Sequence, residues 1–166
     1  MKKIAQGGLL VAAALVLSLI EKMFPLQAVV PIPGIKLGLA NVVTIFALSA
    51  CGTRQALAIL ICRVVLASVF MGSVTGFLFS ISGGLLALLL MRLLLMREGS
   101  WFSLIGISIA GAAAHNIGQI AAATVTLGTT DVIGYLPLLL LSALPMGFVT
   151  GLTASAVLGH LKKIQI

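Results

Sequence analysis

The sequence predicts an all-α integral membrane protein, a single bundle of six transmembrane helices with both termini in the cytoplasm. Of its 166 residues, 61% are hydrophobic and 8% are charged, against about 25% charged residues in a soluble domain. A soluble chain of this length could not hide so much apolar surface from water. Stretches such as LLALLLM and YLPLLLLSAL are apolar on every face, whereas the strands of a membrane barrel alternate in polarity. We therefore expect helices in lipid.

Charged residues and turn residues delimit the expected spans, each of which needs about 20 mostly apolar residues. The first span, residues 4–20, ends at Glu21 and Lys22. It lacks a small-x-small cleavage site before Glu21, so we expect a retained span and not a cleaved signal peptide. The next segment, FPLQAVVPIPG, contains three prolines and is expected to be an irregular connector, because proline interrupts helices. The second span, residues 36–50, ends at CGTR.

Residues 55–91 contain a single charged residue, Arg63, and are about twice as long as one span requires. A reversal is therefore expected within MGSVTG, between a third span at residues 54–70 and a fourth at residues 74–96. The polar loop REGSW precedes a fifth span at residues 102–127, and GTTD precedes a sixth at residues 133–161. The six spans are expected to form one domain, residues 1–166.

The ten Lys and Arg residues outnumber three Asp and Glu residues and give a net charge of +7. Positive residues accumulate on the cytoplasmic side of membrane proteins, and in a six-span chain the termini and the second and fourth connections share one side. That side carries Lys2, Lys3, Arg54, Arg92, Arg97, Lys162 and Lys163, and the other carries Lys22 and Lys36. Both termini are thus expected to be cytoplasmic, and the charge is not interpreted as a sign of nucleic-acid binding. A five-span arrangement would put Lys162 and Lys163 on the opposite side.

Small residues recur at four-residue spacing in the first and sixth spans, which lets helices approach closely in lipid. The stripe in the sixth span consists of Gly147, Gly151, Ser155 and Gly159. For this stripe, internal packing is the favoured interpretation. In the first span, the small residues lie near the expected cytoplasmic half and are interpreted as a docking surface for another membrane protein. The candidate docking residues are Gly8, Ala12, Ala14 and Ser18.

Polar side chains within the spans indicate a candidate site, because such groups are costly in lipid and usually face a cavity or a partner. In the fifth span, HNIGQ places three polar side chains on one broad face. They fit either hydrogen bonds between helices or a polar pocket, and the pocket is favoured. For Arg63, a structural ion pair and a ligand contact both remain open. The excess of cations at the expected outer mouth predicts a ligand with an anionic portion. The candidate substrate-binding residues are Glu21, Lys36, Asn41, Arg63, His115, Asn116 and Gln119.

Several kinds of chemistry are missing from the sequence. There is no G-x-x-x-x-G-K-[ST] loop, so we do not expect the chain itself to use ATP. The three acids, Glu21, Glu98 and Asp131, are scattered and form no pair that could hold Mg²⁺ against a diphosphate. Cys51 and Cys62 lack the spacing of metal ligands. We expect no catalytic site, no cofactor and no metal, and interpret the chain as a binding subunit that needs an energy-supplying partner.

Four segments carry a resemblance to a known family: IPGIKLGLANVVTIFAL, ICRVVLASVF, FSISGGLLALLLM and AHNIGQ. They resemble the Gx transporter family, also labelled heptaprenyl diphosphate synthase component I, over nearly the whole chain. That family is in turn similar to the substrate-binding S components of energy-coupling factor (ECF) transporters.

The resemblance implies a multi-pass subunit in the cell membrane of a bacterium. Such a subunit captures a small micronutrient or precursor outside and delivers it by toppling against a transmembrane coupling subunit, while a pair of partner ATPases uses ATP. The connector FPLQAVVPIPG would cover the ligand. S components typically carry A-x-x-x-A in the first helix, whereas this chain has Gly8 with Ala12 and Ala14 with Ser18 in its place.

The synthase label implies a different class of protein. Prenyl chain elongation uses aspartate-rich motifs that hold Mg²⁺, and this chain has one aspartate, Asp131, so it is not expected to be the catalytic subunit. The alternative to an importer is a non-catalytic accessory subunit of an isoprenoid or quinone biosynthesis or electron-transfer assembly. An isoprenoid or quinone precursor, a flavin or another vitamin would suit the expected cationic mouth.

Overall fold

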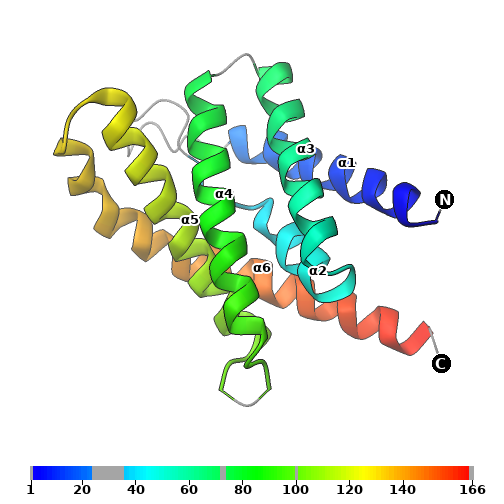
Figure 1. Ribbon diagram of the computed structural model, residues 1–166. Coiled ribbons are helices and arrows are strands. Elements are labelled where there is room, and N and C mark those ends of the chain that lie inside the picture. The colour runs from blue at the N-terminus through cyan, green and yellow to red at the C-terminus, as the bar shows by residue number, and fades with distance from the viewer. Residues whose placement is uncertain (1, 24–35, 72–73, 100, 165–166) are drawn as a thin grey trace.

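A computed structural model describes residues 2–23, 36–71, 74–99 and 101–164 of the protein. This part of the chain is all-helical, with a single isolated bridge between Glu98 and Phe102 and no strand, which confirms the predicted helical class. Its elements are α1 (Lys2–Lys22), α2 (Asn41–Ala50), α3 (Thr53–Met71), α4 (Val74–Leu95), α5 (Leu104–Leu127), the short 3-10 helix η2 (Asp131–Tyr135) and α6 (Leu136–Ile164) (Figure 1).

Five stretches of the described chain are long and apolar enough to cross a membrane. They are Ile4–Glu21, Thr53–Phe70, Val74–Leu95, Leu104–Leu127 and Asp131–Leu161. The protein is therefore a multi-pass membrane protein. The reversal expected within MGSVTG is confirmed, since α3 ends at Met71 and α4 begins at Val74, and the two helices run antiparallel side by side (Figure 1).

The second expected span, residues 36–50, is helical only over Asn41–Ala50. Ten helical residues rise about 15 Å, half of the roughly 30 Å hydrocarbon core of a bilayer. Residues 36–38 have no regular structure, and a turn at Leu39 and Ala40 leads into the helix. Gly38 has φ = 89°, a left-handed conformation that favours glycine, so KLGLAN specifies a turn before α2. The proline-rich connector lies outside the described residues.

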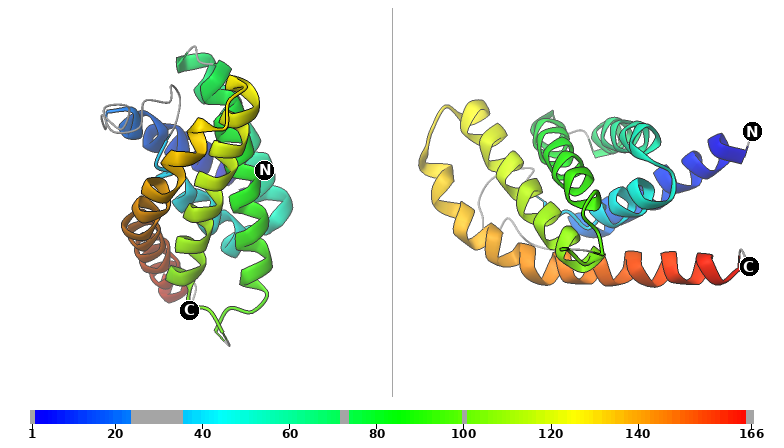
Figure 2. Two further views of the ribbon diagram at one scale, coloured as in Figure 1. Left: turned by 90° about the vertical axis from the view of Figure 1, so that its left-hand side faces the viewer. Right: turned by 60° about the horizontal axis from the view of Figure 1, so that its bottom comes forward.

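The short helix α2 is the centre of the bundle. It contacts all five of the other α-helices, and α4 and α5, like α5 and α6, pack along one another. Within the described chain α1 packs against α2 and α3 but does not touch α6. The N-terminal part of α1 and the C-terminal part of α6 extend toward the same side of the molecule (Figure 2). A site near the N-terminus of α2 is thus surrounded by several elements.

Glycines allow the backbones of α4 and α5 to touch at the level of the predicted polar residues. A Cβ on Gly83 would lie 2.6 Å from the backbone oxygen of His115, and one on Gly118 would lie 2.7 Å from that of Ser82. These distances are below those of real carbon contacts, so a larger residue at either glycine would push the two helices apart. The contact fixes the height and rotation of α5 against α4.

The small residues of α6 pack partly inside the chain, as predicted. A Cβ on Gly147 would lie 2.4 Å from the Cα of Ile109, and one on Gly151 would lie 2.8 Å from the Cα of Ile105. Both glycines therefore let α6 lie directly on α5, as small residues do in membrane bundles. Gly159 has open space where its Cβ would be, so the close packing ends before the C-terminal turns.

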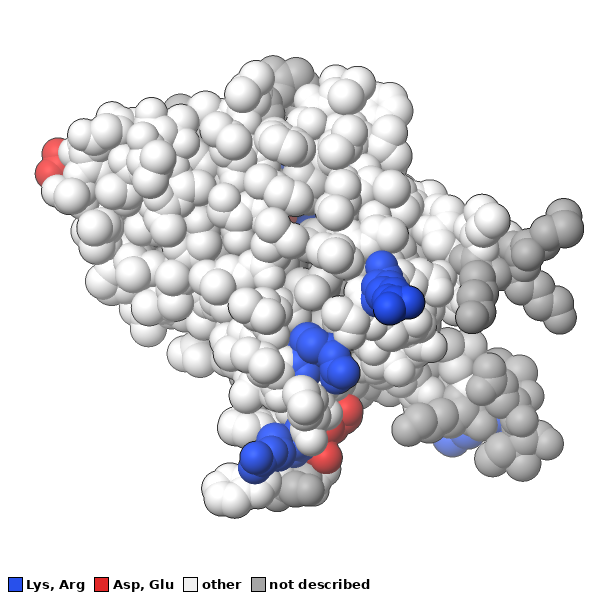
Figure 3. Space-filling model, viewed as in Figure 1, with Lys and Arg blue, Asp and Glu red and all other residues white. Residues whose placement is uncertain are grey.

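The exposed charges lie at the ends of the helices and leave an apolar surface between them (Figure 3). Arg54 at the start of α3, Arg92 in the last turn of α4 and Arg97 in the following loop are all exposed. These positions share one end of the bundle because α3 and α4 are antiparallel. The 3-10 helix η2, which begins at Asp131, follows the opposite end of α5 (Figure 1).

Candidate functional site

The structure brings the predicted polar residues into the interior around the N-terminus of α2. They come from the end of α1, the segment before α2, the start of α2, the middle of α3 and the middle of α5. Asn116 and Gln119 are 0% exposed, Asn41 is 1%, His115 is 2%, and Glu21 and Arg63 are each 5% exposed. Lys36 is half-buried. Polar groups in such a place need partners, and the partners differ from residue to residue.

Glu21 holds the turn that precedes α2. Its carboxylate oxygen Oε1 accepts hydrogen bonds from the backbone N–H groups of Gly38 and Leu39, the latter at 3.3 Å. The charges of Lys36 and Arg63 both attract this carboxylate. A negative charge near the start of a helix is also favoured by the helix dipole. The end of α1 is thereby connected to the start of α2 through one buried side chain.

Gln119 holds the same segment from the other side. Its Oε1 accepts from the backbone N–H of Lys36 at 2.8 Å, and its Nε2 donates to the Lys36 carbonyl at 2.7 Å. The side chain of Lys36 continues inward, where Nζ donates to Oγ of Ser80 on α4 at 3.1 Å. Gln119 therefore positions the backbone of the segment before α2.

Asn116 connects α5 to α6. Its Nδ2 donates to the backbone carbonyl of Leu139 at 2.6 Å, whereas its Oδ1 is buried and has no hydrogen-bond partner among the described residues. A hydrogen bond of this kind between helices is common in membrane bundles. The amide nitrogen of Asn116 thus connects two helices, whereas its amide oxygen makes no hydrogen bond within the described chain.

Asn41, His115 and Arg63 make up the unpartnered part of the site. Within the described chain, both amide atoms of Asn41, both ring nitrogens of His115 and Nη2 of Arg63 are buried without a well-formed hydrogen bond, although the His115 ring interacts with the nearby backbone of Gly83. A Cβ on Gly38 would lie 2.8 Å from Nδ2 of Asn41 and 3.2 Å from Cδ2 of His115, so these two side chains meet beside Gly38. Arg63 and Lys36 both act electrostatically on His115.

The chemistry available in this cluster is recognition of a polar ligand. Two cationic side chains, Lys36 and Arg63, face one acid, Glu21, whose oxygen already accepts two backbone bonds. Asn41 offers a donor and an acceptor, and the His115 ring offers one of each when it is neutral. A buried polar group without a partner costs about 1–3 kcal/mol. The described residues contain no group of three or more His, Cys, Asp or Glu that could hold a metal.

Other polar contacts of the interior were not predicted. Ser80 receives the Lys36 side chain across 44 positions of sequence, and Ser108 of α5 is hydrogen-bonded to Thr150 of α6 at 2.7 Å. Single hydroxyl residues are common in membrane helices and have no distinguishing spacing, so the sequence held no signal for either contact. The sequence did contain a signal for the role of Gly38, because KLGLAN places this glycine between a charged residue, Lys36, and an amide residue, Asn41.

The proposed docking residues of α1 divide between two faces of the helix. Ala14 and Ser18 are 0% and 1% exposed, and Ser18 Oγ donates to the Ala14 carbonyl at 2.9 Å. Gly8 and Ala12 are exposed, because six residues turn a helix by about 240°. Ala14 and Ser18 thus pack inside the chain, which corrects the expectation of one surface with four residues. Of the four candidate docking residues, Gly8 and Ala12 are the two that are exposed.

Comparison with known proteins places the chain in a family. No curated protein and no solved structure is significantly similar to the chain. The family described as heptaprenyl diphosphate synthase component I matches residues 10–157, a range that extends from α1 into α6 and includes every residue of the buried polar cluster. The chain therefore belongs to the heptaprenyl diphosphate synthase component I family, the Gx transporter family that the sequence resembles.

Proposed function

We propose that the chain is the substrate-binding membrane subunit of an ECF-type importer, similar to an S component. The observation that carries this proposal is the set of unpartnered polar atoms on Asn41, His115 and Arg63 in the interior. Ionisable and amide groups at membrane depth are costly and mark ligand or ion sites in many membrane proteins. A ligand that supplies the missing hydrogen bonds would offset this cost when it binds.

The proposed subunit spans the plasma membrane of a bacterium six times and has both termini in the cytoplasm. All 166 residues form one membrane domain, in which α2 together with the segment before it makes the sixth crossing. Support comes from the two ends of the chain, which lie on one side (Figure 2), and from Arg54, Arg92 and Arg97, which lie at one end of the bundle. Positive residues on one side are expected of a cytoplasmic face.

The proposed ligand is a small micronutrient or precursor with an anionic portion. Lys36 and Arg63 outnumber the single acid Glu21 around the cluster, and an added negative charge would balance them. An isoprenoid or quinone precursor, a flavin or another vitamin satisfies this requirement.

In the same proposal the chain is not an enzyme and has no cofactor. ATP is used by a pair of partner ATPases, and the transmembrane coupling subunit docks on the exposed face of α1. Gly8 has open space around the position of its Cβ, and Ala12 is exposed one turn later on the same face. Small residues at this spacing allow a partner helix to approach closely.

A second candidate function follows from the description of the family, which names a component of a synthase. In this alternative the chain is a non-catalytic accessory subunit of an isoprenoid or quinone biosynthesis or electron-transfer assembly. The buried polar cluster would then be a structural device, and the chain would form a stable complex with a partner through its lipid-facing surfaces.

Mass spectrometry of compounds extracted from the protein purified in mild detergent tests the two functions against each other. The variants Arg63→Ala and Asn41→Ala remove cluster residues, and Ser108→Ala removes a buried hydroxyl that is bonded to Thr150 instead. The importer proposal predicts a stoichiometric compound in the wild type and in Ser108→Ala that is lost from the two cluster variants. The same yield of compound in all four proteins would contradict the site, and an empty protein with a stoichiometric partner would favour the accessory subunit.

A further inference from the structure

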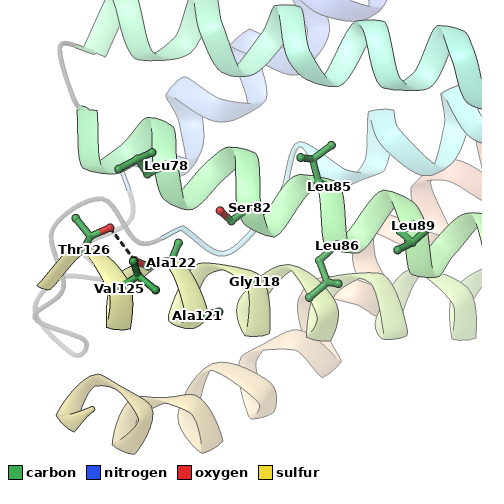
Figure 4. A pocket seen from close by; sticks show the side chains of 10 residues that line it. All are labelled: Leu78, Ser82, Leu85, Leu86, Leu89, Gly118, Ala121, Ala122, Val125 and Thr126. Carbon is green, nitrogen blue, oxygen red and sulfur yellow. Dashed lines mark hydrogen bonds between the residues drawn. The ribbon is translucent and has the colours of Figure 1, made fainter. Parts of the chain in front are cut away.

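A long apolar groove follows the outer side of α4 and α5. Its first section has a volume of about 650 Å³ and is lined by Leu78, Ser82, Leu85, Leu86, Leu89, Gly118, Ala121, Ala122, Val125 and Thr126 (Figure 4). The leucines of α4 form one wall, and the small residues of α5 form the floor (Figure 4). The Thr126 hydroxyl donates to the Ala122 carbonyl at 2.7 Å, which leaves little polar character in the groove.

A second section, of about 390 Å³, continues the groove toward the α4–α5 loop. It shares Leu86 and Leu89 with the first section and adds Leu90, Leu93 and four residues of α5. From Leu78 to Leu93 the groove is about 22 Å long at 1.5 Å per helical residue. This is more than the depth of one leaflet in a hydrocarbon core about 30 Å thick. A single hydrocarbon chain can lie along it.

Positive charge marks the end of the groove at the loop. Arg92 lies in the last turn of α4, and Arg97 and Glu98 follow in the loop, and all three are exposed. Neither section of the groove has a Lys or Arg among its lining residues, so the two arginines lie outside the lining, at the loop end of α4. Figure 3 shows an apolar surface over α4 and α5, with basic atoms at one end and acidic atoms beside them. The groove itself is apolar, and two arginines against one glutamate leave a net positive charge at its loop end.

An exposed aromatic side chain accompanies this charged end. Trp101 is 78% exposed, yet its loop has a fixed backbone, since Trp101 N–H donates to the Arg97 carbonyl at 3.2 Å and Gly99 N–H donates to the Phe102 carbonyl at 3.0 Å. Tryptophan is most stable at the boundary between hydrocarbon and headgroups. Arg92 and Arg97 thus lie where lipid phosphates are found.

We propose that the α4–α5 groove binds an anionic phospholipid of the bilayer, with one acyl chain along the groove and the phosphate at Arg92 and Arg97. Guanidinium groups form charge-assisted hydrogen bonds with phosphate oxygens. This complementarity of an apolar channel with a cationic end favours an amphiphile over a protein helix, which would have to bring its own acid to the same place. The site is separate from the buried polar cluster, and it holds whichever proposed function is correct.

Native mass spectrometry of the detergent-purified full chain tests the site. The protein is incubated with phosphatidylglycerol or with phosphatidylcholine of identical acyl chains, and bound lipid is counted. Each basic residue near a lipid surface favours anionic lipid by about fivefold, so Arg92→Gln and Arg97→Gln should each lower the preference for phosphatidylglycerol by about that factor. Arg54→Gln removes an exposed arginine outside the groove and is the matched control.

Substitutions that fill the groove test separately whether it binds the acyl chain of the lipid. Leu86→Trp and, from the α5 side, Ala121→Leu should lower retention of both lipids while the thermal unfolding midpoint and the folded yield stay unchanged. Equal retention of the two lipids by the wild type, or an equal loss of preference in Arg54→Gln, would overturn the proposal. A preference that survives both groove-filling variants would also overturn it, because the acyl chain would then lie elsewhere.

Discussion

α5 has two faces of opposite character. On one face His115, Asn116 and Gln119 are buried and polar, and on the other Ala121 and Val125 line an apolar groove open to lipid. A soluble helix has the reverse arrangement. The difference shows that the polar residues of this protein were not placed for solubility, so each of them requires a specific partner or a specific use.

The polar face is itself divided. Both amide atoms of Gln119 and Nδ2 of Asn116 bond to the backbone of other elements, whereas Oδ1 of Asn116, the amide of Asn41 and the ring nitrogens of His115 have no well-formed hydrogen bond in the described chain. The first set of atoms fixes the geometry and the second set is left available. Under the proposed function, positioning and ligand recognition are therefore tasks of different residues, although His115, Asn116 and Gln119 lie within about one turn of α5.

The largest expected effect on stability comes from the backbone contact between α4 and α5. Gly83→Val would drive side-chain carbon into the His115 backbone, 2.6 Å from the Cβ position, and should lower the free energy of unfolding by about 3 kcal/mol. Thermal unfolding in detergent measures the effect. The control Gly159→Ala adds carbon where there is open space and should leave the midpoint unchanged. Equal midpoints in the two variants would show that α4 and α5 can separate freely.

Removal of the Gln119 side-chain amide should have the next largest effect on stability. Gln119→Ala loses both hydrogen bonds to the Lys36 backbone and should cost about 2 kcal/mol, since it leaves partly buried backbone groups unpaired. Gln119→Glu keeps the acceptor but loses the donor to the Lys36 carbonyl, so an intermediate loss is expected. Hydrogen exchange at the Lys36 and Gly38 amides should accelerate in both variants. Unchanged exchange would contradict the positioning role.

A smaller loss is expected at the contact between α5 and α6. Ser108→Ala removes a buried hydroxyl bonded to Thr150 at 2.7 Å, and hydrogen bonds between membrane helices are worth about 0.6 kcal/mol on average. Thr150 keeps its hydrogen bonds to the Met146 and Gly147 carbonyls, so its buried hydroxyl is not left without a partner. A loss as large as that of Gln119→Ala would refute this ranking.

Substitutions in the α4–α5 groove should change the free energy of unfolding least. Ala121→Leu lies at an exposed position and adds apolar surface toward lipid, so the free energy of unfolding should change by less than about 0.5 kcal/mol. The same substitution should lower lipid retention, which separates binding from stability on this face. A strong destabilisation would mean that the groove is closed by protein.

Much of this arrangement could be predicted from the sequence, for identifiable reasons. Long apolar runs between charges gave the membrane helices, and the doubled length of residues 55–91 gave the reversal between α3 and α4. HNIGQ, Asn41 and Arg63 were recognised because polar residues are rare in such spans. These signals are local in sequence and follow from the cost of polarity in lipid.

Other features depend on contacts that no local pattern records. Whether Gln119 faces a ligand or the Lys36 backbone depends on a segment 83 positions away. The short α2 was not foreseen because apolar residues before Asn41 extend the apparent span through a glycine turn. On α1, four-residue spacing alone did not reveal that Ala14 and Ser18 face the bundle. Their six-residue offset from Gly8 and Ala12 does place the two pairs on different faces of a helix.

The central claim is that the unpartnered cluster is kept for a ligand at the expense of stability. The most direct test is thermal unfolding of the ligand-free protein with Asn41→Leu, which removes two buried polar atoms without partners at nearly constant volume. The account predicts a higher midpoint than the wild type together with loss of the co-purified compound, since unpartnered buried groups cost about 1–3 kcal/mol each. A lower midpoint would contradict it and would show that Asn41 supports the fold.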